Sequence, residues 1–104
     1  MAGSGEDMNQ TIIQAIRNKK LLEIRYHDFF RIVEPHCYGQ NKKGEFTLRC
    51  YQVSGGSASG SPADWKLLLQ DEMKSIAMTG ADFYGPRQGY KLLDPAIPSI
   101  VAQL

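Results

Sequence analysis

The feature of this chain that most limits its fold is an alternation of apolar and polar side chains, which starts after the first twenty residues. Leu22, Ile24 and Tyr26 alternate with charged residues, and the segments 46–51 and 65–69 follow the same pattern. Successive side chains on a β-strand point to opposite faces of a sheet, so the alternation predicts half-buried strands. The chain is therefore expected to be mainly β.

Turn signals separate the alternating segments. Residues 27–29 and 41–44 are rich in the residues that favour tight turns. Pro35 cannot donate a backbone hydrogen bond, so the strand that contains it is expected to end or bend there. Residues 71–73 predict a short turn or a 3₁₀ turn before a last strand over 74–78. One helix followed by about five short strands, with turns at such spacing, is typical of a small closed or nearly closed barrel.

The N-terminal part has a helical pattern instead. Apolar residues recur at four-residue spacing from Met8, which predicts an amphipathic helix over residues 8–19 with Asp7 as its cap. Residues 1–7 are expected to be a flexible leader or a cloning remnant. Basic residues cluster at the C-terminal end of this helix. We interpret them as offsetting the negative end of the helix dipole, in preference to forming a phosphate site.

Two glycine-rich stretches and the C-terminus complete the chain. Residues 54–62 are rich in Gly and Ser and predict a mobile surface loop. Residues 80–90 predict an ordered loop that covers one end of the barrel. Ile97, Ile100 and Leu104 fall at helical spacing, which predicts a short closing helix that begins near Pro98.

Size and charge limit the function classes. A chain of 104 residues with 42% hydrophobic residues forms one domain with one core. The formal charge of +1 gives no global basic field, so any nucleic-acid role needs a local patch. The apolar runs are too short to span a bilayer, so no membrane partner is expected. Two cysteines in such a chain suggest reduced thiols and a cytoplasmic location.

Three motifs follow one another along the chain: Tyr26 with Arg31 and Pro35, then Phe46-Thr47-Leu48, and then a set that runs from Lys66 to Met73. In this order and spacing they resemble the WYL domains of bacterial transcriptional regulators. WYL domains open with a helix and a strand that ends in Tyr, followed by an Arg, three residues and a Pro; Tyr26, Arg31 and Pro35 match. The Trp-Tyr-Leu tripeptide of the family corresponds to the segment Phe46-Thr47-Leu48. A later family pattern, Arg-x-Phe-x-Leu-Asp-Arg-Ile, matches a set of positions in the last third of the chain: Lys66, Leu68, Asp71, Glu72 and Met73.

The resemblance covers most of residues 9–83, and it departs from the family at Thr47, which replaces an aromatic residue, and at Glu72, which replaces an Arg. It implies a single domain over residues 8–104, a small Sm-like or SH3-like five-stranded barrel with an N-terminal helix and a short C-terminal helix. It further implies a regulatory module that senses a ligand, in some members single-stranded nucleic acid, through basic and aromatic residues.

The candidate binding residues are cations and aromatic residues on the predicted strands: Arg25, Arg31, Arg49 and Lys66, with Tyr51 and Trp65. Cations contact phosphates and aromatic faces stack on bases, so convergence on one face would create an anion site. Alternatively, the arginines form a solvated face paired with Glu23, Glu34 and Glu45, and Trp65 belongs to the core. Arg87, at the tip of residues 85–89, is a second candidate; the alternative there is a turn that packs Phe83 and Tyr90 onto the barrel.

No residue pattern predicts catalysis, a metal site or a cofactor. His27, His36, Cys37 and Cys50 lack the spacing of metal ligands, and neither histidine is placed to activate a nucleophile. Cys37 and Cys50 are expected as buried thiols on neighbouring strands. The sequence thus favours a non-enzymatic module whose partner is an anionic small molecule, such as a nucleotide, or single-stranded nucleic acid. The alternative is a barrel for protein interaction or homo-oligomerisation through an exposed strand edge.

Overall fold

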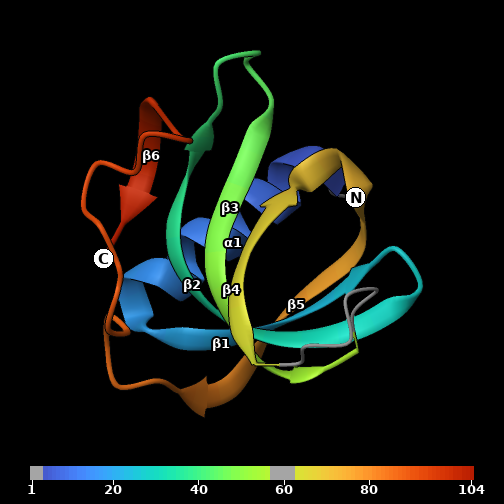
Figure 1. Ribbon diagram of the computed structural model, residues 1–104. Coiled ribbons are helices and arrows are strands. Elements are labelled where there is room, and N and C mark those ends of the chain that lie inside the picture. Colours follow the sequence, from blue (N-terminus) through green and yellow to red (C-terminus); the bar gives the residue numbers. More distant parts are fainter. Residues whose placement is uncertain (1–3, 57–62) are drawn as a thin grey trace.

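The computed structural model describes residues 4–56 and 63–104 and is mainly β, as predicted. The described residues form one α-helix, six strands and a 3₁₀ turn: α1 (Ser4–Asn18), β1 (Lys20–Tyr26), β2 (Phe29–Gln40), β3 (Phe46–Gly55), β4 (Asp64–Leu69), η1 (Gln70–Glu72), β5 (Met73–Asp82) and β6 (Ser99–Gln103). Figure 1 shows the strands curving around a common core. The predicted loop over 54–62 begins two residues inside β3, and residues 57–62 lie outside the described part.

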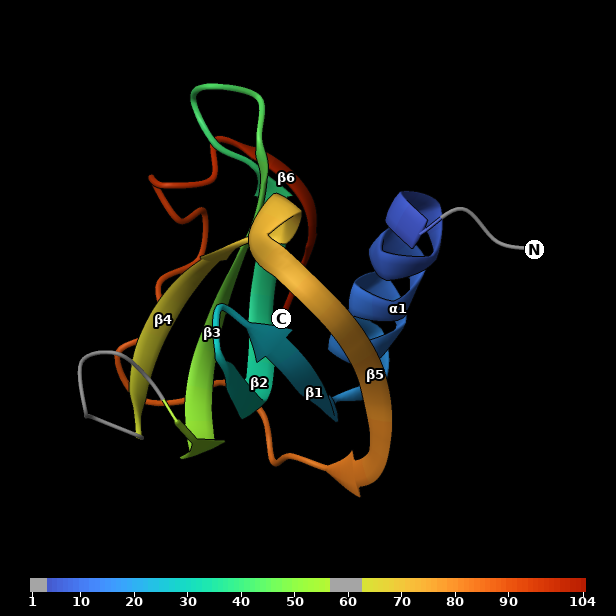
Figure 2. The ribbon, with the colours of Figure 1, turned by 90° about the vertical axis from the view of Figure 1, so that its right-hand side faces the viewer.

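All strand pairs are antiparallel, and the strands follow the order β4-β3-β2-β1-β5. Among the described residues β4 and β5, at the two ends of this order, do not pair, so the sheet is not closed. The turn η1 connects β4 to β5, and the two strands diverge from it in different directions (Figure 2). The long strand β2 pairs with β3 along most of one edge; its other edge pairs first with β1 and then, past a register shift, with β6.

The helix α1 supplies one wall of the core. Ile12, Ala15 and Ile16 are buried on its inner face, where they pack with Leu22, Ile24 and other apolar residues of the sheet. The helix predicted over 8–19 is confirmed, but it begins at Ser4, so Asp7 lies within the helix and not at its cap. Residues 4–7 of the expected leader thus belong to α1, and residues 1–3 lie outside the described part of the chain.

The turns agree with the sequence. Residues 27–28 turn between β1 and β2 with His27 at a φ of 57°, and residues 41–45 connect β2 to β3 with Gly44 at a φ of 80°. The chain continues through Pro35 as one strand, and a register shift against β3 falls between Pro35 and Cys37. Pro35 therefore bends β2 without ending it, as its missing donor allows at an irregular position.

The prediction of a closing helix near Pro98 is wrong, and so is the count of five strands. Residues 99–103 form β6, with Tyr38 opposite Ala102 and Gly39 opposite Ile100. The second half of β2 has a backbone edge that β1 has left, and β6 satisfies those groups. The β-branched residues Ile100 and Val101 also favour an extended chain over a helix.

Gly39 is the position where β6 approaches β2 most closely. A Cβ atom at Gly39 would lie 2.1 Å from the Ser99 carbonyl oxygen and 2.9 Å from Ile100 Cα. We expect Gly39→Ala to lower the unfolding free energy by about 1–3 kcal/mol, because backbone must move to admit a methyl group. Urea denaturation measures the change. The control is Gly80→Ala, where a Cβ meets nothing within 4 Å; equal losses in both variants would contradict the close approach.

No helix in the described ranges, 4–56 and 63–104, is long and apolar enough to cross a membrane.

Candidate anion-binding pocket under the cover segment

Residues 83–98, here called the cover segment, cross the outer face of β2, β3 and β4. Figure 2 shows the cover segment and α1 on opposite sides of these strands. The register places Glu34 opposite Tyr51, and Tyr51 opposite Trp65, so these side chains share one face. The segment contains no regular structure. Polar contacts attach it to this face through Arg87, Tyr90 and Asp94, and the Tyr90 hydroxyl donates to the His36 carbonyl at 3.2 Å.

The first contact joins Arg87 to Glu34. The Arg87 guanidinium donates from Nε and Nη2 to the two carboxylate oxygens of Glu34, at 2.8 and 3.1 Å. It also lies 4.4 Å from the centre of the Tyr51 ring, which is cation–π distance. Both acceptor oxygens and the ring are thus engaged, so Arg87 holds the cover segment to the sheet.

The second contact is made by His36, whose side chain is fully buried. Its Nε2 accepts the backbone N–H of Arg87 at 3.0 Å, so its Nδ1 carries the proton and donates to the Glu34 carbonyl at 2.8 Å. The ring packs against Trp65, Phe83 and Tyr90. Burial lowers the pKa of His36 from its ordinary value, so a neutral imidazole occupies this position at pH 7.

The third contact is the ion pair of Arg49 and Asp94. Arg49 donates to Asp94 from Nε at 2.7 Å and from Nη2 at 3.5 Å, and the Ala96 N–H donates to the same carboxylate at 2.9 Å. Burial raises the pKa of Asp94, but the hydrogen bonds from Arg49 and Ala96 outweigh it and leave the pKa below its ordinary value. Asp94 therefore stays ionised with its charge offset by Arg49.

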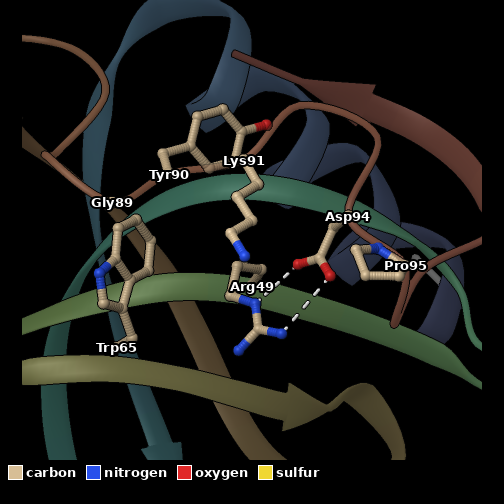
Figure 3. Close-up of a pocket in the computed structure, with 7 residues that line it drawn as sticks. All are labelled: Arg49, Trp65, Gly89, Tyr90, Lys91, Asp94 and Pro95. Atoms are coloured by element: carbon tan, nitrogen blue, oxygen red, sulfur yellow. Dashed lines mark hydrogen bonds and ion pairs between the residues drawn. The ribbon is translucent and has the colours of Figure 1, made fainter.

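A pocket of about 320 Å³ lies between the cover segment and the sheet, lined by Arg49, Trp65, Gly89, Tyr90, Lys91, Asp94 and Pro95. In Figure 3 the Lys91 side chain extends toward Arg49, and Trp65 stands across from them. The Trp65 and Tyr90 rings are nearly parallel, at 20°, with their centres 6.3 Å apart. The lining thus combines two cations, one carboxylate and two aromatic rings.

The structure does not bring the four predicted strand cations together. Arg49 lines the pocket, with Tyr51 on the same face. Lys66 lies opposite Cys50, one residue from Arg49 along β3, so it belongs to the other face of the sheet. Arg31 is 4% exposed, and Arg25 lies over the Phe30 ring at the β1–β2 turn.

Arg31 has a place in the interior. Its guanidinium lies 5.1 Å from the centre of the Tyr26 ring and 5.8 Å from that of Phe29, and Nη1 donates to Gln52 at 3.5 Å. Its Nε has no hydrogen-bond partner among the described residues. The stacking of two rings on this cation indicates that Arg31 stabilises the end of the core.

The acidic residues that pair with the arginines are also not those that the alternative interpretation expected. Glu34 pairs with Arg87, and Glu45 accepts from Asn41, while Arg49 pairs with Asp94 of the cover segment. The turn interpretation of residues 85–89 fits the structure, because Phe83 is buried and Tyr90 packs on His36. Trp65 is only partly buried, so it belongs to the pocket wall as well as to the packing under the cover segment.

Sequence reasoning missed Lys91 and Asp94, which complete the pocket. Both lie in a segment without periodicity, so nothing in the local pattern indicates which strand they face. The one available signal is an acid and a base close together between Tyr90 and Pro95, in a stretch otherwise made of apolar residues.

The cysteines are buried free thiols, as expected. Burial raises the pKa of Cys37 to about 11 and that of Cys50 to about 12, so neither is a thiolate at neutral pH. Within the described residues no group of three or more His, Cys, Asp or Glu side chains is placed to hold a metal ion.

Comparison with known proteins gave no match: no family model, no curated protein and no solved structure is similar enough to this chain to identify a relative.

Proposed function

We propose that this chain is a non-enzymatic sensing module that binds a small anionic ligand with a planar ring, such as a nucleotide, in the pocket under the cover segment. The observation that carries this proposal is the presence of Arg49 and Lys91 in a pocket whose lining includes one carboxylate, Asp94. Asp94 offsets one of the two positive charges, so an anion is the ligand that the remaining charge favours.

The aromatic side chains that line the pocket support the proposal that the ligand carries a planar ring. Trp65 and Tyr90 lie nearly parallel at one side of the pocket and offer π-faces that accept a planar group. A volume of about 320 Å³ is at the lower end of the range for ligand pockets, which suits a ligand no larger than a mononucleotide.

The positions of the other cations favour a small ligand over a long strand of nucleic acid. A single strand needs a continuous row of cations and aromatic residues along a groove. Here Arg31 is buried, Arg87 is held by Glu34, and Lys66 lies on the other sheet face. Arg49 and Lys91, by contrast, line one pocket.

We also propose that the sheet is a small Sm-like or SH3-like barrel of the WYL type. The strand order β4-β3-β2-β1-β5 and the 3₁₀ turn that connects β4 to β5 support this assignment. A regulatory role and a cytoplasmic location follow from the same resemblance and from the two buried free thiols.

The test uses the only tryptophan of the chain, Trp65, which lines the pocket. Titration with nucleoside monophosphates, with inorganic phosphate and with a short single-stranded DNA should change Trp65 fluorescence saturably for the nucleotide, with an affinity that weakens as salt rises. Lys91→Gln should weaken nucleotide binding about tenfold or more, because a hydrogen bond to a charged group contributes about 1.5–3 kcal/mol.

Lys74→Gln is the matched control. It removes the same charge from β5, whose residues do not line the pocket, and should leave the affinity unchanged. Equal weakening of nucleotide affinity in both variants would mean that the effect of Lys91→Gln comes from the net charge of the protein and not from the pocket. If none of the three probes changes Trp65 fluorescence, the proposed ligand class is refuted.

A further inference from the structure

One edge of the strand β4 has no other strand beside it. In the described part of the chain β4 pairs with β3 alone, and β5 runs away from it after η1 (Figure 2). Near the start of β4, the Trp65 N–H donates to Asp64 Oδ1 at 2.8 Å. At its end, the Leu69 N–H donates to the Tyr26 hydroxyl at 3.2 Å. Side chains thus take the place of a neighbouring strand at both ends of this free edge.

Leu67 lies between Trp65 and Leu69 and has no such partner. The backbone groups of alternate residues in an antiparallel strand point to the same edge, so the Leu67 N–H and C=O also face the free edge of β4. Within residues 4–56 and 63–104, no strand lies beside β4 there. In an antiparallel pair, one residue can exchange two hydrogen bonds with one residue of the added strand. The edge thus offers one pair of hydrogen bonds, at Leu67.

An open groove of about 680 Å³ includes the same residue in its lining. Its apolar part is formed by Tyr26, Leu67, Leu69, Pro95 and Ala96. Leu67 is 42% exposed and lies opposite Arg49, so its side chain is on the outer face of the sheet. Residues paired across two strands project to the same face. A residue added opposite Leu67 would therefore place its side chain beside Leu67 at the groove, where an apolar group is favoured.

The charges of the groove favour an acidic group as well. Its charged lining residues are Lys42, Lys43, Glu45 and Glu72. Glu45 accepts a hydrogen bond from Asn41 at 3.0 Å, and Glu72 accepts hydrogen bonds from two side chains at the end of β1. The two lysines are exposed, and neither has an acidic partner among the residues that the structure describes. The charge that is open to a partner is thus positive, at the β2–β3 turn.

We propose that the free edge of β4 and this groove bind an extended peptide segment of a partner protein, which adds to the sheet as a strand. The segment has an apolar residue opposite Leu67 and an acidic residue that reaches Lys42 and Lys43. Backbone hydrogen bonds then contribute affinity, and the side chains contribute specificity. The site does not depend on the proposed anionic ligand, because Arg49 and Lys91 do not line the groove, so either proposal can fail without the other.

Amide hydrogen exchange of the unaltered chain, followed by NMR, tests whether the edge is open. The Leu67 N–H should exchange about tenfold faster or more than the Leu68 N–H, which faces β3. Slow exchange at Leu67 in dilute protein would show that the fold itself uses this N–H and would overturn the proposal. Protection of Leu67 that rises with protein concentration would assign the edge to a second copy of the chain and would also overturn it.

The binding probes are short peptides from a random library displayed on phage, selected on the parent chain after depletion on Leu67→Pro. Proline lacks the N–H that the added strand needs, and a free strand edge tolerates it. The selected peptides, made synthetically, should contain apolar and acidic residues and bind Leu67→Pro about tenfold more weakly or worse. Leu67→Ala keeps the N–H and should lose less affinity. If no selected peptide distinguishes Leu67→Pro from the parent chain, the edge is not a docking site.

Methylation of the peptide backbone tests the same hydrogen bonds without any change to the protein, so it does not depend on the folding of Leu67→Pro. An N-methyl group on the peptide residue opposite Leu67 should abolish binding. The same group on either neighbouring residue should have little effect, because those N–H groups point away from β4. Loss at all three positions, or at none, would contradict binding as an added strand.

The acidic residue is tested by removing the charge of both lysines. Lys42→Gln with Lys43→Gln should weaken the binding of the selected peptides severalfold and make it less sensitive to salt. The matched control, Lys19→Gln with Lys74→Gln, removes two charges from residues that do not line the groove and should leave the affinity unchanged. Equal weakening in the two double variants would overturn the assignment of an acidic residue to the partner.

Discussion

Replacement of Arg49 by methionine should lower the free energy of unfolding by about 3–5 kcal/mol, the usual cost of removing one member of a buried ion pair. The Asp94 side chain is only 8% exposed, and the guanidinium of Arg49 offsets its charge. Methionine keeps the apolar stem of Arg49 but removes both of its hydrogen bonds to the buried carboxylate, which retains the Ala96 N–H and the charge of Lys91 as weaker compensation. Urea denaturation at pH 7, followed by far-UV circular dichroism, measures the loss.

The matched control is the ion pair of Lys20 and Asp82, in which the Asp82 side chain is 72% exposed. Lys20→Met should cost less than about 1 kcal/mol, because water already solvates such a pair. Similar losses in the two variants would mean that the Arg49–Asp94 pair is solvated and does not anchor the cover segment.

The carboxylate itself gives a second comparison. Asp94→Asn keeps an oxygen for the Ala96 N–H and leaves Arg49, whose side chain is 28% exposed, able to reach water. We therefore expect a smaller loss of stability than from Arg49→Met. The same substitution removes the one carboxylate of the pocket lining and should tighten the binding of the proposed anionic ligand. A weaker affinity would contradict the assignment of the pocket to anions.

The strands and their turns could be predicted from the sequence because their signals are local. The alternation at Leu22, Ile24 and Tyr26 is visible without knowledge of the partner strand, and the three side chains are buried together. The C-terminal strand could not be predicted in this way. Ile97, Ile100 and Leu104 fit a helical period, and the outcome depends on the free edge of β2, about sixty residues earlier in the chain.

The residues of the candidate site divide in the same way, into those with a local sequence signal and those whose position depends on a distant segment. Arg49 and Tyr51 were candidates because their strand has a clear alternation, and the structure places both on the outer face. Their partners lie in a segment without periodicity, and the ion pair of Arg49 with Asp94 spans 45 positions. Alternation also puts Arg31 on the face of Val33, but only the rings of Tyr26 and Phe29 explain how a cation is accommodated there.

Replacement of His36 by alanine should cost about 3 kcal/mol, close to the loss for other large buried rings. The ring lies between Trp65, Phe83 and Tyr90, and its two nitrogens satisfy the Glu34 carbonyl and the Arg87 N–H. Alanine leaves a cavity at this point and removes both hydrogen bonds. The loss of unfolding free energy, again from urea denaturation, should come with a less compact cover segment and greater quenching of Trp65 by iodide.

His36 should also make the stability depend on pH in a defined direction. Burial lowers its pKa below the ordinary value of 6.5, so the unfolded chain takes up a proton more readily than the folded chain. The contribution of the neutral ring is complete above pH 6.5 and is lost as the pH falls toward the folded-state pKa. Protonation at Nε2 would replace the acceptor of the Arg87 N–H by a donor, next to the Arg87 guanidinium.

The other groups that face the ring do not change this sign. Burial raises the pKa of Tyr90 to about 12, so Tyr90 remains neutral throughout the range in which His36 titrates. Glu34 and Arg87 are already joined as an ion pair on one side of the ring. The measurement is best made in a His27→Gln background, where His36 is the single histidine of the chain. Unfolding free energies from pH 5 to 8 and the titration of the His36 Cε1 proton by NMR then report on one group.

The decisive variant adds His36→Gln to that background. A glutamine can donate to the Glu34 carbonyl and accept from the Arg87 N–H, so it keeps the polar contacts but does not titrate. We expect it to be more stable than the alanine variant and to lose the fall in stability below pH 6.5. If the fall persists with glutamine at position 36, another group causes it. If it vanishes, acid acts through the neutral His36 imidazole of β2, on which the cover segment packs.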